Sequence, residues 1–155
     1  MIEVCVGTVA CGKSTYCKQR AKAGAIIIND DSIVEALHAG DYRLYRKELK
    51  PLYKAVETQI FLSAVALGRD VIIDRGLSLT KSSRKRWIGL AKSFDQTIIA
   101  RVFKFESPEI HAKRRFDSDN RGLDYDYWLN VAKQHVSVYQ TPWTEEGFDE
   151  VVWMS

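Results

Sequence analysis

The chain of 155 residues lacks the features that mark several large classes of protein. Its three cysteines and three histidines include no CxxC pair and no Cys/His spacing suited to zinc, so a zinc domain or a disulfide framework is not expected. No apolar run approaches the length that spans a membrane, and the first residues have the pattern of a strand instead of a signal peptide. We therefore expect a cytoplasmic protein without a membrane partner.

Repeats, low-complexity tracts, linkers and a strong charge imbalance are also missing from the sequence. The net charge of +3 permits a polyanionic partner without requiring one. The apolar fraction of 46% and the charged fraction of 28% are typical of soluble globular proteins. At this length one domain can bury a sizeable core without disulfides, so we expect a single domain over residues 1–155.

The most informative stretch is residues 7–14, Gly-Thr-Val-Ala-Cys-Gly-Lys-Ser, which has the spacing GxxxxGKS and follows the apolar run of residues 2–6. Glycines allow such a turn to point successive N–H groups at a triphosphate, and the helix that begins near Lys13 adds a positive dipole end. Lys13 would reach the β- and γ-phosphates, and the Ser14 hydroxyl would hold Mg²⁺. The predicted site for ATP and Mg²⁺ comprises Gly7, Thr8, Cys11, Gly12, Lys13, Ser14 and Thr15.

Strand and helix patterns alternate along the rest of the chain, which is typical of a parallel sheet covered by helices. Apolar runs predict strands at residues 2–6, 25–28, 70–73, 97–103 and 151–153. Helical spacing and cap residues predict helices at residues 13–23, 33–37, 51–67, 87–91, from 108 onward and 128–139, with a helical turn near 42–50. The fold class is α/β: a kinase-like P-loop NTPase with three α/β/α layers and a parallel five-stranded sheet.

Carboxylates follow two of the predicted strands, at the edge where ligands bind in open α/β sheets. Asp30 and Asp31 follow residues 25–28, and one of them would accept the proton of an acceptor hydroxyl while the other caps the next helix. Asp74 follows residues 70–73, where it would act on Mg²⁺ directly, through water, or on a neighbouring arginine. The alternative for Asp74 is an ordinary turn residue at a strand end.

The stretch of residues 113–122 is rich in arginine and short polar residues, as expected for a lid that closes over the phosphates. Arg121 and one of Arg114 and Arg115 are expected to contact phosphate. The alternative is a solvated helix face whose arginines complement the helix dipole.

Three further features have two interpretations each. The basic cluster of residues 81–86 beside Trp87 would either contact a nucleic-acid backbone or form a solvated helix face. Cys11 is either a reactive thiol beside phosphate or a variable loop position. His135 lies on an apolar helical face and is predicted to be a core histidine instead of a ligand, while no partner is predicted for His38 or His111.

Together these segments resemble the kinase domain of the polynucleotide 5′-hydroxyl kinase family, including its phage and bacterial members. The matching segments are GTVACGKST, IIINDDSIV, DVIIDRG with the helix SRKRW, VFKFESPEIHAKRR with NRG, and the closing residues 139–149. The resemblance implies that Lys13 binds phosphate, Asp31 is the general base, Asp74 is the acid after the third strand and Arg121 is the lid arginine. Two positions depart from the family: Val34 replaces an arginine that holds the substrate phosphate in phage members, and Arg75-Gly76 replaces Thr-Asn.

These features predict an ATP-dependent phosphotransferase with an alcohol acceptor. The acceptor would be a nucleic-acid hydroxyl, either a 5′-OH end of DNA or RNA or a hydroxymethyl group on a modified pyrimidine, with Arg75 replacing the missing arginine. The alternative acceptor is a small metabolite, a nucleoside, an antibiotic or, as in toxin-type kinases, a sugar nucleotide. A nucleotide-dependent switch is disfavoured because the sequence contains no guanine-reading NKxD motif.

Overall fold

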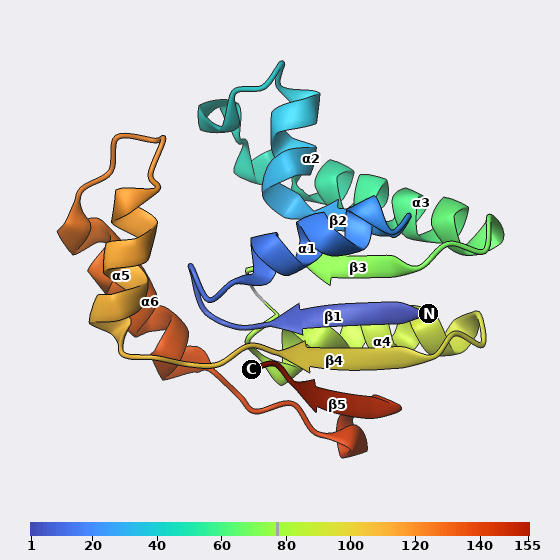
Figure 1. Cartoon of the computed structure of the whole chain (residues 1–155). Coiled ribbons are helices and arrows are strands. Elements are labelled where there is room, and N and C mark those ends of the chain that lie inside the picture. Colours follow the sequence, from blue (N-terminus) through green and yellow to red (C-terminus); the bar gives the residue numbers. More distant parts are fainter. Residues whose placement is uncertain (77) are drawn as a thin grey trace.

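The computed structural model describes residues 1–76 and 78–155, which form a five-stranded parallel sheet flanked by helices (Figure 1). The sheet order is β2-β3-β1-β4-β5, and every pair of neighbouring strands is parallel. The strands are β1 (Ile2–Val6), β2 (Ile26–Asn29), β3 (Val71–Asp74), β4 (Ile98–Val102) and β5 (Glu150–Trp153). The predicted parallel five-stranded sheet is therefore confirmed.

Six α-helices among the described residues connect and cover these strands. They are α1 (Lys13–Lys22), α2 (Asp30–Leu37), α3 (Lys50–Ala66), α4 (Lys81–Ser93), α5 (Pro108–Asp117) and α6 (Tyr125–Val138). The stretch before α3, where a helical turn was predicted near residues 42–50, consists of two short 3₁₀ turns, Tyr42–Leu44 and Lys47–Leu49. The start of α5 follows the predicted signal, because Ser107 caps the helix ahead of Pro108. The structure adds a capping box of Thr80 and Ser83 at α4.

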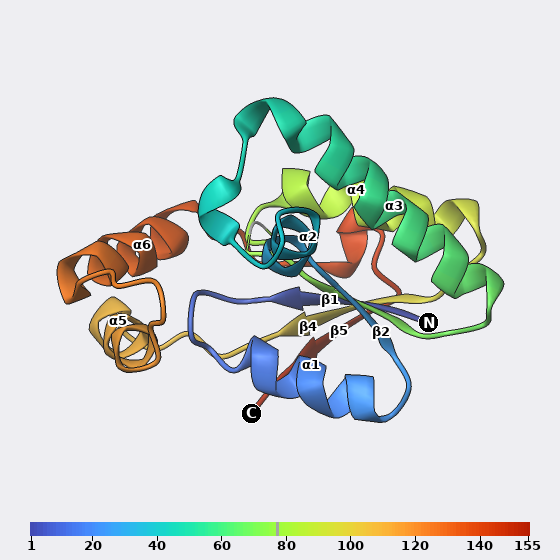
Figure 2. The same ribbon diagram turned by 90° about the horizontal axis from the view of Figure 1, so that it is seen from above.

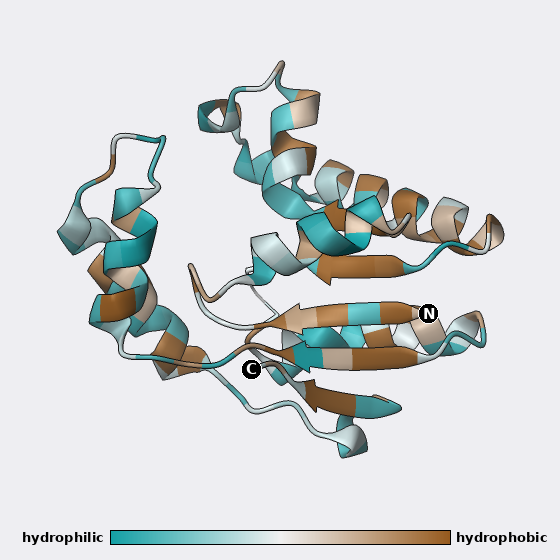
Figure 3. Cartoon of the chain, viewed as in Figure 1, coloured by the Kyte–Doolittle hydropathy of each residue, from teal (hydrophilic) through white to brown (hydrophobic). Residues whose placement is uncertain are grey.

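Helices cover the two faces of the sheet unequally, as the view from above shows (Figure 2). Helices α3 and α4 lie over one face, where the even-numbered β1 residues Ile2, Val4 and Val6 are buried in the larger core cluster. Helix α1 lies over the other face, where Cys5 and Cys17 belong to a smaller apolar cluster. Because successive strand residues point to opposite faces, the apolar strands of Figure 3 contribute to both layers.

Two arginines of the basic cluster on α4 are engaged within the protein, which disfavours the interpretation of this helix as a nucleic-acid contact, although Lys81 and Lys85 are exposed. Arg84 has 0% exposure and binds Glu146 through two hydrogen bonds, of 2.9 Å and 2.6 Å. Arg86 donates to Glu57 at 2.6 Å, and the Trp87 ring has 0% exposure. Neither guanidinium nor the indole is therefore available to a phosphate backbone or to a base.

The buried Arg84–Glu146 pair predicts a large stability effect. Arg84→Leu is expected to lower the free energy of unfolding by about 3–5 kcal/mol, because the Glu146 carboxylate would remain buried without its partner. Urea unfolding measures the change, and Lys85→Ala, at an exposed position on the same helix, is the matched control with an unchanged midpoint. An Arg84→Leu midpoint equal to that of the wild type would contradict the prediction.

Among the residues that the structure describes, no helix combines the length and the hydrophobicity that crossing a bilayer requires.

Candidate active site

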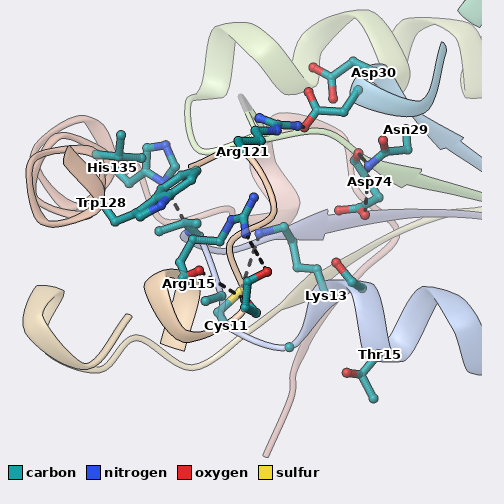
Figure 4. Close-up of a pocket in the computed structure, with 18 residues that line it drawn as sticks. Cys11, Lys13, Thr15, Asn29, Asp30, Asp74, Arg115, Arg121, Trp128 and His135 are labelled. Atoms are coloured by element: carbon teal, nitrogen blue, oxygen red, sulfur yellow. Dashed lines mark hydrogen bonds and ion pairs between the residues drawn. The ribbon is translucent and has the colours of Figure 1, made fainter. Parts of the chain in front are cut away.

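A cavity of about 570 Å³ lies beyond the carboxyl ends of the strands, between the loop that follows β1 and the hairpin formed by α5 and α6 (Figure 4). This α5–α6 hairpin stands apart from the sheet, beyond the arrowheads of the strands in Figure 1. Its two helices pack together around a small apolar cluster of their own. The cavity is lined by residues 9–15, by Asn29, Asp30, Asp31, Asp74 and Gly76, and by Arg115, Ser118, Arg121, Trp128, Val131 and His135.

The loop at residues 7–14, called the phosphate loop below, has the backbone geometry that its glycines predict. Gly12 has φ 103°, a left-handed conformation that favours glycine, and Ala10 also lies in this region at φ 53°. At Gly7 a Cβ atom would lie 2.5 Å from Cys11 Sγ and 3.0 Å from Phe103 Cβ, so any side chain there would force these neighbours to move. The first turn of α1 has no side-chain cap, which leaves its amides free to bind an anion.

Lys13 lies across this loop and is held by it. Its Nζ donates to the carbonyl oxygens of Gly7 at 2.9 Å and Thr8 at 2.6 Å, and lies 3.6 Å from Cys11 Sγ. Gly7 and Thr8, which were predicted to bind the nucleotide, do not line the cavity. Their contribution is to hold the Lys13 ammonium through their carbonyl oxygens. The ammonium group is therefore positioned at the loop, where the phosphates of a nucleotide would bind.

Asp74 and Asn29 are paired at the ends of neighbouring strands. Asn29 Nδ2 donates to the Asp74 carbonyl at 3.1 Å and to Asp74 Oδ2 at 3.2 Å, as expected from their aligned positions in β2 and β3. Within residues 1–76 and 78–155 Asp74 forms no ion pair with an arginine, and no cluster of three His, Cys, Asp or Glu side chains could hold a metal alone. The Ser14 hydroxyl and the Asp74 carboxylate nevertheless fit Mg²⁺, which takes a few oxygen ligands from protein and the rest from phosphates and water.

The two carboxylates after β2 have different partners, and neither is the helix cap. Asn29 caps α2 by accepting from the Ser32 amide at 2.9 Å, which corrects the prediction that Asp30 mainly serves as the cap. Asp30 instead lies 3.5 Å from Arg75 Nε, and burial raises the pKa of Asp30 against the opposing effect of Arg75. The same Arg75 nitrogen lies 3.3 Å from the buried Glu57, so Arg75 is already neutralised by two carboxylates.

Asp31 faces the opposite way, toward the hairpin. Its Oδ2 accepts a hydrogen bond from Arg121 Nη2 at 2.9 Å, and the Arg121 guanidinium lies 4.3 Å above the Tyr42 ring. Asp31 and Arg121 are 90 positions apart in the sequence, and the fold brings them together inside the cavity.

The other arginines of the predicted lid divide between two environments. Arg115 lines the cavity and stacks 4.3 Å above the Trp128 ring. Arg114 is half-exposed, pairs with Glu106 and does not line the cavity. The structure therefore places Arg115 and Arg121, and not Arg114, where phosphate contacts are possible.

Three cavity residues on α6 were not predicted as site residues. Trp128, Val131 and His135 share one face of the helix, and Figure 4 shows Trp128 and His135 side by side, at the far end of the cavity from Asn29 and Asp74. Their spacing predicts the common face but not what that face covers. His135, predicted to be a core histidine, instead lines the cavity, and its Nδ1 accepts from the Val9 amide at 3.2 Å. His38 also has a partner, the Tyr53 hydroxyl at 2.8 Å.

A loop of this sequence after the first strand, acids at the next strand ends and an arginine-bearing hairpin on this sheet define a P-loop NTPase fold of the kinase type. The family is shown by sequence as well. The model of the AAA_33 family, described as an AAA domain, matches residues 2–139, and the chain belongs to this family. A comparison with curated protein sequences gives no match.

Solved structures share the fold over nearly the whole chain. Shikimate kinase from Acinetobacter baumannii in complex with shikimate has a TM-score of 0.61 and 15% identity, over 99% of this chain and 83% of that one. Gluconokinase from Sinorhizobium meliloti 1021 has a TM-score of 0.57 and 16% identity, over 97% and 79%. Chaetomium thermophilum Kti12 in complex with ADP-AlF3 has a TM-score of 0.61 and 16% identity, over 100% and 89%.

At such identities the structural likeness shows the fold alone. The comparisons therefore show a P-loop kinase-type domain and do not show membership of the polynucleotide 5′-hydroxyl kinase family.

Proposed function

We propose that the protein is an ATP-dependent kinase that transfers the γ-phosphoryl group to a hydroxyl of a small polar molecule. The observation that carries this proposal is the convergence of three groups on one cavity: Lys13 of the phosphate loop, Asp31 at a strand end and Arg121 of the hairpin. Phosphoryl transfer depends on positioning and on charge stabilisation, and these three groups are the parts that it requires.

The chain's residues would divide the work as follows. Bound ATP with Mg²⁺ supplies the activated phosphoryl group. The loop amides and Lys13 would hold its phosphates, and the Ser14 hydroxyl and Asp74 would hold the metal. Arg115 and Arg121 would neutralise charge that develops on the transferring group, while Asp31 would take the proton of the acceptor hydroxyl. Asp30, fixed by Arg75, would line the acceptor end of the cavity.

The charges at the acceptor end favour a small acceptor over a nucleic acid. Asp30, Asp31 and Asp74 all line the cavity there, and the nearby Arg75 is paired with Asp30 and Glu57. A phosphate backbone is attracted by unpaired cations, and three carboxylates would repel it. The cavity volume of about 570 Å³ also lies within the roughly 300–1,000 Å³ typical of small-molecule pockets. Shikimate kinase and gluconokinase, which share the fold, are named for small hydroxylated acids.

A transfer panel with radiolabelled ATP and Mg²⁺ tests the proposal. Its arms are shikimate, gluconate, other polyols, nucleosides and aminoglycoside antibiotics, against 5′-OH DNA, 5′-OH RNA, hydroxymethyl-pyrimidine DNA and a reaction without acceptor. A small-molecule product whose KM is insensitive to salt would support the proposal. If the oligonucleotide becomes labelled, with a KM that rises steeply with salt, the proposed small acceptor is wrong, although the protein is still a kinase.

Arg121 is expected to act mainly in the transition state. Arg121→Ala should lower kcat by on the order of 10²-fold while changing ATP affinity only modestly, because charge on the transferring group is greatest at that point. Steady-state kinetics with the acceptor found in the panel separates kcat from KM. The matched control is Arg114→Ala, which removes an arginine of the same hairpin outside the cavity and should leave both constants near wild type. An active Arg121→Ala enzyme would remove Arg121 from the catalytic groups.

A further inference from the structure

A hydrogen bond and an apolar side chain join the tip of the phosphate loop to the α5–α6 hairpin. The Val9 amide donates to His135 Nδ1 at 3.2 Å, across 126 positions of sequence. The Val9 side chain packs against the apolar cluster between the two helices, which includes Ala112, Trp128 and Ala132. The loop that would bind phosphate and the hairpin that carries Arg115 and Arg121 are therefore in direct contact.

His135 has the right protonation state for this contact. Burial, and then the positive charge of Lys13 and the proximity of His111, lower the pKa of His135 to about 4. The ring is therefore neutral at pH 7, and a ring that accepts at Nδ1 carries its single proton on Nε2. A second histidine lies on the other helix of the hairpin: His111 of α5 is fully buried, and its Nε2 accepts from the Glu106 amide at 3.0 Å.

The loop needs such support because its next residue is strained. Ala10 is a non-glycine residue at φ 53°, a conformation that persists only where neighbouring contacts enforce it. The residues that follow, Gly12 to Ser14, supply the amides that would bind phosphate. If Val9 lost its partner, its amide would lose this hydrogen bond, and Ala10 could relax and move those amides out of place.

We propose that His135 is a positioning residue that holds the phosphate loop in its nucleotide-binding shape by accepting the Val9 amide hydrogen bond. It touches neither the reacting atoms nor, in this role, the nucleotide, and it acts through the loop. Because the bond comes from α6, it also makes the position of the hairpin and the shape of the loop interdependent. The proposal rests on the nucleotide site of the proposed kinase but not on the identity of its acceptor.

Three substitutions separate the hydrogen bond from the bulk of the ring. His135→Asn places an oxygen near the position of Nδ1 and should keep the bond. His135→Gln places its oxygen nearer the position of Nε2, and His135→Leu has no acceptor, so both should lose the bond. The probes are ADP with Mg²⁺ in isothermal titration calorimetry and hydrogen–deuterium exchange of the peptide that contains Val9, with melting temperature as the check on folding.

The expected result is an ADP affinity on the order of 10-fold weaker, with faster exchange at Val9, for His135→Gln and His135→Leu. His135→Asn should remain close to wild type in both measurements. If Leu and Gln also remain close to wild type, or if Asn is as impaired as Leu, the hydrogen bond has no positioning role and the proposal is overturned. If His135→Leu fails to fold, the comparison of His135→Asn with His135→Gln still tests whether the hydrogen bond positions the loop.

These measurements do not depend on phosphoryl transfer. A wild-type protein that binds ADP but phosphorylates no acceptor would contradict the proposed function and leave the role of His135 testable. A wild-type protein that does not bind ADP would contradict the nucleotide site itself, while exchange at Val9 would still report the hydrogen bond.

Discussion

Replacing Lys13 with alanine is expected to abolish nearly all phosphoryl transfer while the protein stays folded. The Lys13 ammonium is the only side-chain cation that the described structure places on the phosphate loop itself, where it binds the Gly7 and Thr8 carbonyls. Both bonds go to backbone carbonyls of the same loop and neither joins two helices or strands, so the melting temperature should change little. Ser14→Ala should lose activity as well, through the metal.

The measurements are ATP affinity by calorimetry and turnover with the acceptor found in the panel. Lys18→Ala removes an exposed lysine one turn further along the same helix and is the matched control, with wild-type values expected. Nucleotide affinity and turnover equal to wild type in both Lys13→Ala and Ser14→Ala would refute the assignment of the phosphate loop.

The second large effect is expected at Asp31. Asp31→Asn should lower kcat by roughly 10²–10⁴-fold, the range typical of general acid–base catalysis, with ATP binding little changed. The acceptor hydroxyl must lie between its base and the γ-phosphate. Asp31 lines the cavity and is turned toward Arg121 and the hairpin, whereas Asp30 is turned toward Arg75.

Asp30→Asn is the contrasting variant. Asp30 is turned toward Arg75 and α3, away from the hairpin, so its replacement should disturb acceptor binding and raise the acceptor KM more than it lowers kcat. Burial raises the pKa of Asp30, which makes this carboxyl the competitor for the role of base. An inactive Asp30→Asn enzyme beside an active Asp31→Asn enzyme would place the base one residue earlier.

Features encoded locally were predictable from the sequence. The phosphate loop lies within eight consecutive residues, and its glycines are required by backbone geometry that the motif itself specifies. The strands are mostly apolar on both faces because helices cover both, so they appear in the sequence as apolar runs, interrupted in β1 and β4 by the paired Glu3 and Arg101. The two faces of α6 follow from its 3.6-residue period in the same way.

The parts that the sequence did not reveal depend on partners distant along the chain. Arg84 looks like a surface residue in a basic cluster until Glu146, 62 positions later, is seen to neutralise it. Asp30 looks like a helix cap, although Asn29 performs that role and Arg75 binds Asp30. In each case the residue type allowed several roles, and only the tertiary fold determined the partner.

One ion-pair chain has a consequence for how relatives of this protein can diverge. Asp30, Arg75, Glu57 and Arg86 follow one another from the cavity to the surface of α4, and their formal charges sum to zero. Loss of Glu57 alone would leave two guanidinium groups facing each other around a buried gap, so such a change is tolerable only if an arginine is lost with it. Relatives are therefore expected to keep all four residues or to exchange them in charge-conserving pairs. In an alignment, Glu57 and Arg86 should covary with the acceptor-side residues Asp30 and Arg75, although Arg86 does not line the cavity.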